Sequence, residues 1–302
     1  MKFKKTLKTL LLSIPLLLGS SSKAEDVYLT PQDNWWNKIE QTTGTKDKPS
    51  NVYFDVGAYS DLFHINDRLQ VQPYVNLEGI IGTGDLYVVN KEWTPTTGAS
   101  TVINNAVTFN GDNEVRNIIF EEDFANAGLK AIGNKFNIHD CYFFVTNGID
   151  VYPLQDKETL INNCVFYQCD TAILNALATP GVYGTNSKIE NNKFLGCRYG
   201  IYTAGTLDIG NEFDKGNNLF NGNKFNIRNE SGKLISAIWN YWYDSQGNLL
   251  TTEQDIQSTI ENINSKGIKG ISEVDVIPFY STDYFEQGNE QQSDVKNWEM
   301  YK

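Results

Sequence analysis

The feature that most constrains the fold of this chain is a short segment that recurs at nearly constant spacing. The segment INNCVFYQCDTAI (161–173) is followed 28 residues later by IENNKFLGCRYGI (189–201). Neighbouring copies lie 23 to 28 residues apart, which indicates stacked units that are each too small to bury an apolar face alone. The six copies read VRNIIF at 115, IHDCYF at 138, INNCVF at 161, IENNKF at 189, KGNNLF at 215 and IWNYWY at 238.

Two positions of the repeat predict its conformation. The third is Asn or Asp in every copy, and these side chains tolerate unusual backbone angles at a bend and can bond to each other when stacked. The sixth is aromatic and is expected to point inward, together with a second apolar residue six or seven positions later. The third-position residues are Asn117, Asp140, Asn163, Asn191, Asn217 and Asn240, the sixth-position residues are Phe120, Phe143, Phe166, Phe194, Phe220 and Tyr243, and the later apolar residues are Ile149, Ile173, Ile201 and Ile227.

These units are shorter than helical repeats, which need roughly 33 residues, and they lack the pattern of leucine-rich repeats. A coil of three short strands per turn fits both the length and the composition. The sequence therefore predicts an all-β fold, a right-handed parallel β-helix of about eight rungs. We expect a signal peptide (1–24), an N-terminal cap segment (25–49), the β-helix (50–245) and a C-terminal helix, strand and polar tail (246–302).

Both ends of such a coil need a cover, because an open rung exposes unpaired strand edges. The segment NWWNKIEQ (34–41) predicts a short amphipathic helix with Trp36 and Ile39 on one side. A second helix is expected to begin after Thr252 as N-cap, with Asp255 three residues on, and to stop at Gly267.

The first 24 residues have a lysine-rich start, an apolar stretch and a small-x-small ending at Ala24, which is the layout of a secretory signal peptide. No cysteine follows the apolar stretch, so a lipoprotein anchor is not expected, and no later segment approaches the roughly 20 apolar residues of a membrane span. The chain is expected to be secreted or periplasmic.

The charge of the mature chain restricts its partners. The first 24 residues hold five of the 25 basic residues and none of the 37 acidic ones, so the remainder carries 20 − 37 = −17. A field of this sign repels nucleic acids and anionic membranes. It also opposes binding to a polyanionic polysaccharide unless a cation such as calcium bridges the two.

The four cysteines fall into two pairs of equivalent repeat positions, Cys141 with Cys164 and Cys169 with Cys197. Neighbouring rungs place such Cα atoms about 4.8 Å apart, within disulfide range. Two alternatives therefore remain for the cysteines. They form two disulfides, which export would favour, or two stacks of buried free thiols.

The opening VGAYSDLF…VNLEGI (56–80) has the form of a G-x-Y…L-x-G entry into a coil. The close NYWYDSQG…TTEQDIQSTIENI…VIPFY (240–280) has the form of an ending in which N-x-W-G precedes a helix, with Tyr243 in place of Gly. In these segments the chain resembles the pectate-lyase-like superfamily of secreted right-handed β-helix proteins. The resemblance covers roughly residues 50–280 and implies the fold. It does not imply one activity, because that superfamily includes lyases, hydrolases, esterases, adhesins and tailspikes.

Motifs for particular activities are missing. The polygalacturonase N-T-D, D-D and G-H-G clusters, the pectate-lyase W-x-D-H and V-x-x-S motifs and the pectin-methylesterase D-F-I-F-G and L-G-R-P-W motifs do not occur, although LQDKETL (154–160) faintly resembles an esterase segment. If the protein is catalytic, a lyase is favoured over a glycoside hydrolase or an esterase.

Register provides a candidate ligand-binding strip instead. The position after each interior Ile gives one outward column, Asp150, Leu174, Tyr202 and Arg228, and two residues further come Tyr152, Ala176, Ala204 and Glu230. Aromatic rings can stack on sugars, and acids with an arginine can orient hydroxyl groups. We expect Asp150, Tyr152, Tyr202, Arg228 and Glu230 to bind a polysaccharide or cell-surface glycan. The alternatives are a solvated face with no ligand and, for the whole protein, a non-catalytic adhesin or envelope component.

Other polar residues give weaker indications. A calcium site is conceivable at Glu121–Asp123 or at Asp208, Glu212 and Asp214, but solvated acidic turns explain both groups. His64 and His139 lack metal-ligand spacing and are expected to be structural or surface residues. Trp239, Tyr241, Trp242 and Tyr243 are expected to seal the last rung.

Overall fold

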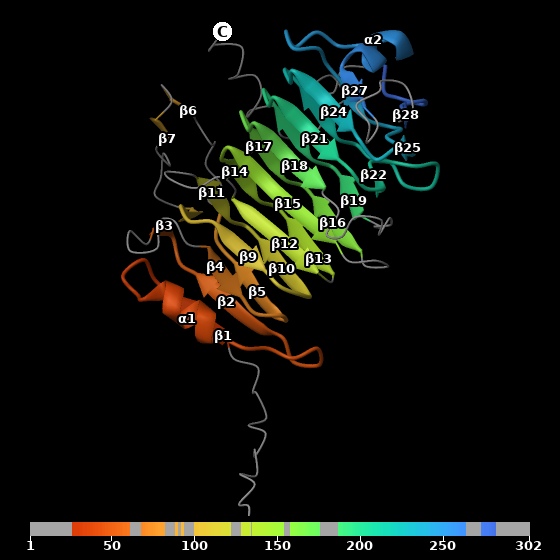
Figure 1. The fold of residues 1–302 in the computed structure, drawn as a ribbon. Coiled ribbons are helices and arrows are strands. Elements are labelled where there is room, and N and C mark those ends of the chain that lie inside the picture. Colours follow the sequence, from red (N-terminus) through yellow and green to blue (C-terminus); the bar gives the residue numbers. More distant parts are fainter. Residues whose placement is uncertain are drawn as a thin grey trace, which may run out of the picture.

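The chain forms a right-handed parallel β-helix in which three sheets run along one axis (Figure 1). The structure is a computed structural model. It describes residues 26–60, 68–81, 88–89, 92–93, 100–121, 128–133, 135–153, 158–175, 187–263 and 273–281. The predicted signal peptide and His64 lie outside these residues.

Sheet I has ten parallel strands and begins each turn of the coil. Its strands extend beyond the predicted 50–245 range at both ends, because the first strand precedes the cap helix and the last follows the second helix. In spatial order they are β1 (Asp26–Leu29), β2 (Ser50–Phe54), β5 (Val75–Glu78), β10 (Asn113–Arg116), β13 (Phe136–His139), β16 (Thr159–Asn162), β19 (Ser187–Glu190), β22 (Leu207–Asp208), β25 (Leu234–Ser236) and β28 (Glu273–Asp275).

Sheet II follows sheet I after a sharp turn and carries the aromatic residues of the repeat. Its eight parallel strands agree with the predicted number of rungs. They are β3 (Gly57–Tyr59), β8 (Thr101–Ile103), β11 (Ile119–Glu121), β14 (Tyr142–Phe144), β17 (Val165–Tyr167), β20 (Lys193–Leu195), β23 (Leu219–Asn221) and β26 (Tyr241–Trp242).

Sheet III closes each turn and also has eight parallel strands. Between β5 and β8 the chain forms a separate antiparallel pair, β6 (Val88–Val89) with β7 (Glu92–Trp93). The strands of sheet III are β4 (Leu69–Val71), β9 (Val107–Phe109), β12 (Leu129–Gly133), β15 (Asn147–Pro153), β18 (Thr171–Asn175), β21 (Tyr199–Thr203), β24 (Phe225–Asn229) and β27 (Ile260–Asn262).

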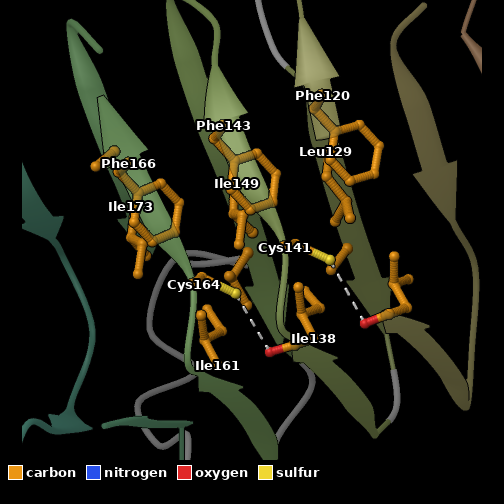
Figure 2. Close-up of a cluster of buried hydrophobic side chains, with 14 of the residues drawn as sticks. Phe120, Leu129, Ile138, Cys141, Phe143, Ile149, Ile161, Cys164, Phe166 and Ile173 are labelled. Carbon is orange, nitrogen blue, oxygen red and sulfur yellow. Dashed lines mark hydrogen bonds between the residues drawn. The ribbon is translucent and has the colours of Figure 1, made fainter. Parts of the chain in front are cut away.

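The interior is a set of side-chain columns, one residue per rung (Figure 2). Rings of successive turns stack nearly parallel, as Phe143 does on Phe166 with 4.9 Å between ring centroids. The prediction of a phenylalanine column is confirmed as far as Phe220. At the last rung it is wrong by one residue, because Phe220 pairs with Trp242 and not with Tyr243.

The bend between sheets I and II uses the predicted asparagines. Asn117, Asn163 and their equivalents have φ between 51° and 57°, the left-handed region that Asn tolerates better than most residues. Here too the last rung differs, since Trp239 takes the left-handed position and Asn240 the next one.

The predicted bonding between stacked asparagines occurs one position later than expected. Asn192, Asn218 and Asn240 are fully buried, and each Nδ2 of the first two donates to the Oδ1 of the next, at 3.2 and 2.9 Å. Among the described residues, no side-chain hydrogen bond joins two of the asparagines that occupy the bend. The bend thus supplies backbone geometry, and the buried column beside it supplies the ladder.

Both predicted end helices are present. α1 (Trp35–Gln41) buries Trp35, Trp36 and Ile39 against the first rungs. α2 (Glu253–Ser258) begins at the predicted cap, where Thr252 Oγ1 accepts from the Asp255 N–H at 3.1 Å. Its predicted continuation toward Gly267 is wrong, because the chain from Ile260 forms β27, which pairs with β24.

All four cysteines are buried free thiols, so of the two predicted alternatives the structure shows stacked thiols and not disulfides. Cys141 Sγ donates to the His139 carbonyl at 3.2 Å, and Cys164 Sγ to the Asn162 carbonyl at 3.3 Å. Each also points at a carbonyl of the preceding rung, as the dashed lines in Figure 2 show. Burial, and then the neighbouring thiol, raise the pKa of Cys164 well above its ordinary value.

A thiolate is the reactive form of cysteine, so these side chains should be inert in the native protein. We expect no reaction with a thiol reagent under native conditions. In denaturant without reductant, all four thiols should react. A count below four in denaturant would show that a disulfide had formed.

Candidate functional site

The predicted strip lies in register on the outer face of sheet III. Asp150 pairs with Leu174, Leu174 with Tyr202, and Tyr202 with Arg228 on successive strands. Glu230 follows directly after β24, and Tyr152 lies near the end of β15, whereas Ala176 lies outside the described residues. The predicted register of the column is thus confirmed. Its polar members form two groups, however, and the strand that carries Leu174 lies between them.

The first group centres on Arg228. Its guanidinium donates from Nε to Glu230 Oε1 at 2.8 Å and also contacts this oxygen through Nη2. Tyr202 donates its hydroxyl to the other Glu230 oxygen at 2.8 Å, and Glu261 Oε2 lies 3.3 Å from Arg228 Nη1. Three adjacent strands, β21, β24 and β27, therefore hold one connected network.

Aromatic rings surround this network. The Arg228 guanidinium lies over the rings of Tyr202 and Tyr199, 4.8 and 5.4 Å from their centroids. Tyr199 also stacks on Phe225 with 5.5 Å between centroids. Gly200 allows the neighbouring rung to approach closely, because a Cβ there would lie 2.6 Å from the Asn226 carbonyl oxygen and 3.2 Å from the Phe220 ring.

The network fixes the protonation of its members. Burial alone would lower the pKa of Arg228, but its hydrogen bonds to Glu230 and Tyr199 raise it overall. Burial raises the pKa of Tyr202, and the bond to Glu230 adds to this effect. We expect a permanently charged arginine beside a neutral tyrosine, which suits the group to binding and orientation better than to proton transfer.

The second group surrounds Asp150. Lys130, the partner of Asp150 in the neighbouring strand, lies over the Tyr152 ring at 4.7 Å from its centroid. Burial raises the pKa of Asp150, while Arg68 and Lys130 oppose the shift. Burial also lowers the pKa of Arg68, whose Nε donates to Thr108 Oγ1 at 2.9 Å.

The raised pKa of Asp150 predicts a pH-dependent stability difference. A carboxyl group that titrates at higher pH in the folded than in the unfolded chain destabilises the fold once both states have ionised. Asp150→Asn should therefore raise the melting temperature at neutral pH. The gain should vanish at a pH below the unfolded-state pKa, where both states of the wild type are protonated. An equal gain at both pH values would contradict the assignment, and thermal melts at the two pH values test it.

The other polar candidates are engaged in local structure. His139 bonds through Nδ1 to Asp140 Oδ2 at 2.6 Å and through Nε2 to Glu114 Oε1 at 3.2 Å. Asp208 accepts from the Gly210 N–H at 2.8 Å, and Asp214 pairs with Lys188. Within the described ranges, no group of three or more His, Cys, Asp or Glu side chains could hold a metal ion. Of the Glu121–Asp123 turn only Glu121 is described.

Register reasoning missed Lys130, Tyr199, Glu261 and Arg68. Lys130 and Glu261 belong to the predicted column and could have been found by extending it one strand at each end. Tyr199 precedes the interior Ile201 by two, so simple alternation along the strand would have placed it inside. Arg68 lies before the first recognised repeat, so no sequence signal pointed to it.

No model of a protein family, no curated protein and no solved structure matches this chain. In the part of the chain that the structure describes, no helix is long and apolar enough to cross a membrane. Assignment of the fold thus depends on the geometry of the three sheets alone.

Proposed function

We propose that the protein binds a polysaccharide along the outer face of sheet III, with Tyr199, Tyr202, Arg228 and Glu230 as the central contacts. The supporting observation is the network on β21, β24 and β27, which combines aromatic rings with fixed hydrogen-bonding groups. Tyrosine rings bury much area at low entropic cost, and a paired arginine and glutamate can exchange bonds with sugar hydroxyls. A rigid sheet presents these groups at a spacing that an extended glycan can follow.

Charge favours a neutral or weakly charged glycan. Across both groups of the strip, Arg68, Lys130 and Arg228 are balanced by three carboxylates, those of Asp150, Glu230 and Glu261. The strip therefore offers no excess positive charge, and the mature chain as a whole is acidic.

Binding is tested by titrating the protein with a panel of neutral and uronate polysaccharides. Tyr202→Ala should weaken binding of the recognised glycan by about three- to tenfold, the value of one aromatic contact. Tyr53→Ala is the matched control, because Tyr53 stacks on Tyr28 on the outer face of sheet I at 5.1 Å and lies away from the strip. Equal losses in both variants, or no binding to any polysaccharide, would overturn the proposal.

A lyase is a second candidate, because the Asp150 group combines two cations with a tyrosine. β-Elimination needs a base and a cation that neutralises the uronate carboxylate. Arg68 and Lys130 are the candidate base and cation, respectively. The test is ultraviolet absorbance of unsaturated products from uronate polysaccharides, with and without calcium. Binding without product from any substrate would favour an adhesin or envelope component.

A further inference from the structure

The two polar groups on sheet III contain the same kind of contact. In each group a cation lies over a tyrosine ring, Lys130 at 4.7 Å from the Tyr152 centroid and Arg228 at 4.8 Å from the Tyr202 centroid. All four side chains are partly exposed. The structure thus presents one ring and cation pair twice on the same face.

The two pairs have opposite order along the coil axis. Sheet III contains β12, β15, β18, β21 and β24 as successive neighbours. These strands carry in turn Lys130, Tyr152, Leu174, Tyr202 and Arg228, and Tyr152 lies two residues beyond the common column on its strand. The two rings therefore come from every second strand, about 10 Å apart along the axis at the usual strand spacing.

The strand between the rings offers a different contact. Leu174 is partly exposed and has no hydrogen-bonding group in its side chain. Its apolar surface suits the C–H groups of a sugar ring, which lose contact with water when they lie on it. A ligand that crosses from one ring to the other thus meets an aromatic, an aliphatic and an aromatic contact in turn.

This order restricts the shape of a glycan that contacts both rings. When sugars are joined through equatorial bonds, the chain forms an extended ribbon in which each sugar advances by about one strand spacing. Each sugar is also turned over relative to the one before, so every second sugar presents the same side to the sheet. A glycan joined through axial bonds coils instead, and its sugars do not return to the same orientation on every second strand.

Building on the glycan binding proposed above, we infer that the ligand is an equatorially linked, ribbon-like glycan that lies along the coil axis with one sugar per strand. Tyr152 and Tyr202 contact two sugars that present the same side, and the sugar between them covers Leu174. A trisaccharide is the shortest ligand that reaches both rings. A pentasaccharide also reaches Lys130 and Arg228 at the two ends.

Calorimetric titration with cello- and manno-oligosaccharides, from the disaccharide to the hexasaccharide, tests this arrangement. Affinity should rise roughly tenfold from the disaccharide to the trisaccharide, because the second ring is then bound within the same complex. Further gains should be smaller and should end at the pentasaccharide. Malto-oligosaccharides, which contain axial bonds, should show no such step.

Variants at the first ring separate the two contacts. Tyr152→Ala should abolish the step, so that the trisaccharide binds as weakly as the disaccharide, while the affinity for the disaccharide changes by about twofold at most. Tyr152→Phe keeps the ring and should keep the step, which guards against an effect on folding. Tyr53→Ala on the outer face of sheet I is the control and should retain the whole pattern.

Other outcomes would overturn the inference. A step of the same size in Tyr152→Ala or with malto-oligosaccharides, or an affinity that does not depend on length, would reject the ribbon and leave glycan binding in place. Loss of the step in Tyr152→Phe as well as in Tyr152→Ala would reject the ring as the contact. If no oligosaccharide and no polysaccharide binds, the proposed glycan-binding function fails, and the ribbon with it.

Discussion

Phe166→Ala should lower the free energy of unfolding by about 3–5 kcal/mol, the cost typical of removing a large buried aromatic side chain. Phe166 is fully buried and stacks on Phe143 at 4.9 Å and on Phe194 at 5.2 Å between centroids. The surrounding backbone cannot close the cavity, because the hydrogen bonds of three parallel sheets fix the distance between rungs. Phe166 also lies in the middle of the phenylalanine column, so its removal weakens the contact between the two halves of the coil.

Urea denaturation followed by circular dichroism measures this effect. Because each rung contacts only its neighbours, we expect the variant to unfold with a broader transition as well as an earlier midpoint. Phe166→Leu, which fills most of the cavity, is the control and should cost clearly less. A loss below about 1 kcal/mol for Phe166→Ala, typical of surface substitutions, would show that the residue does not belong to a packed interior.

Asn218→Ala should destabilise the fold to a similar extent for a different reason. Asn218 Nδ2 donates to the Ile189 carbonyl and to Asn240 Oδ1, both at 2.9 Å, and its Oδ1 accepts from the Asn192 backbone N–H at 3.0 Å. Alanine would remove the side-chain partner of the Ile189 carbonyl and of the Asn192 N–H, and each buried group left unpaired costs about 1–3 kcal/mol. Asn240 Oδ1 would keep only the Asn218 backbone N–H. We expect a total loss of about 3–5 kcal/mol, because the remaining groups relax only partly.

The matched control is the asparagine at the bend. Asn163 is exposed and has φ of 52°, so its role is conformational. Asn163→Ala should cost about 1–2 kcal/mol from the left-handed backbone, and Asn163→Gly should be tolerated. Equal losses for Asn218→Ala and Asn163→Ala in urea denaturation would contradict the distinction between a buried ladder and a bend.

The sequence contained enough information for the architecture because one rung is one repeat. The spacing from Ile161 through Asn163 to Phe166 recurs in the next rung at Ile189, Asn191 and Phe194, so strand, bend and interior residue follow from one another. The prediction failed at the final rung, where Ala237 rather than Ile238 continues the interior column of sheet I. The bend that follows is therefore one residue earlier. Asn240 still matched the pattern, because asparagine suits both the bend and the buried ladder.

The site was predicted only where the repeats were recognised. Tyr202, Arg228 and Glu230 were placed together correctly because their rungs are regular, and the structure joins them directly. Arg68 lies before the first recognised repeat, and Glu261 was missed because the segment that forms β27 was expected to continue the C-terminal helix. The strand register alone could not predict that the strip forms two groups. The division depends on whether the side chains on either side of Leu174 are long enough to contact each other.

Hydroxyl-radical footprinting with a bound oligosaccharide tests most directly the proposal that the coil presents a carbohydrate-binding face on sheet III. Bound glycan should slow oxidation of Tyr199 and Tyr202 on β21 and of Phe225, the partner of Tyr199 on the next rung. Oxidation of Tyr28 and Tyr53 on sheet I should be unchanged. Slowed oxidation on sheet I with none on β21 and β24 would contradict the proposed binding face.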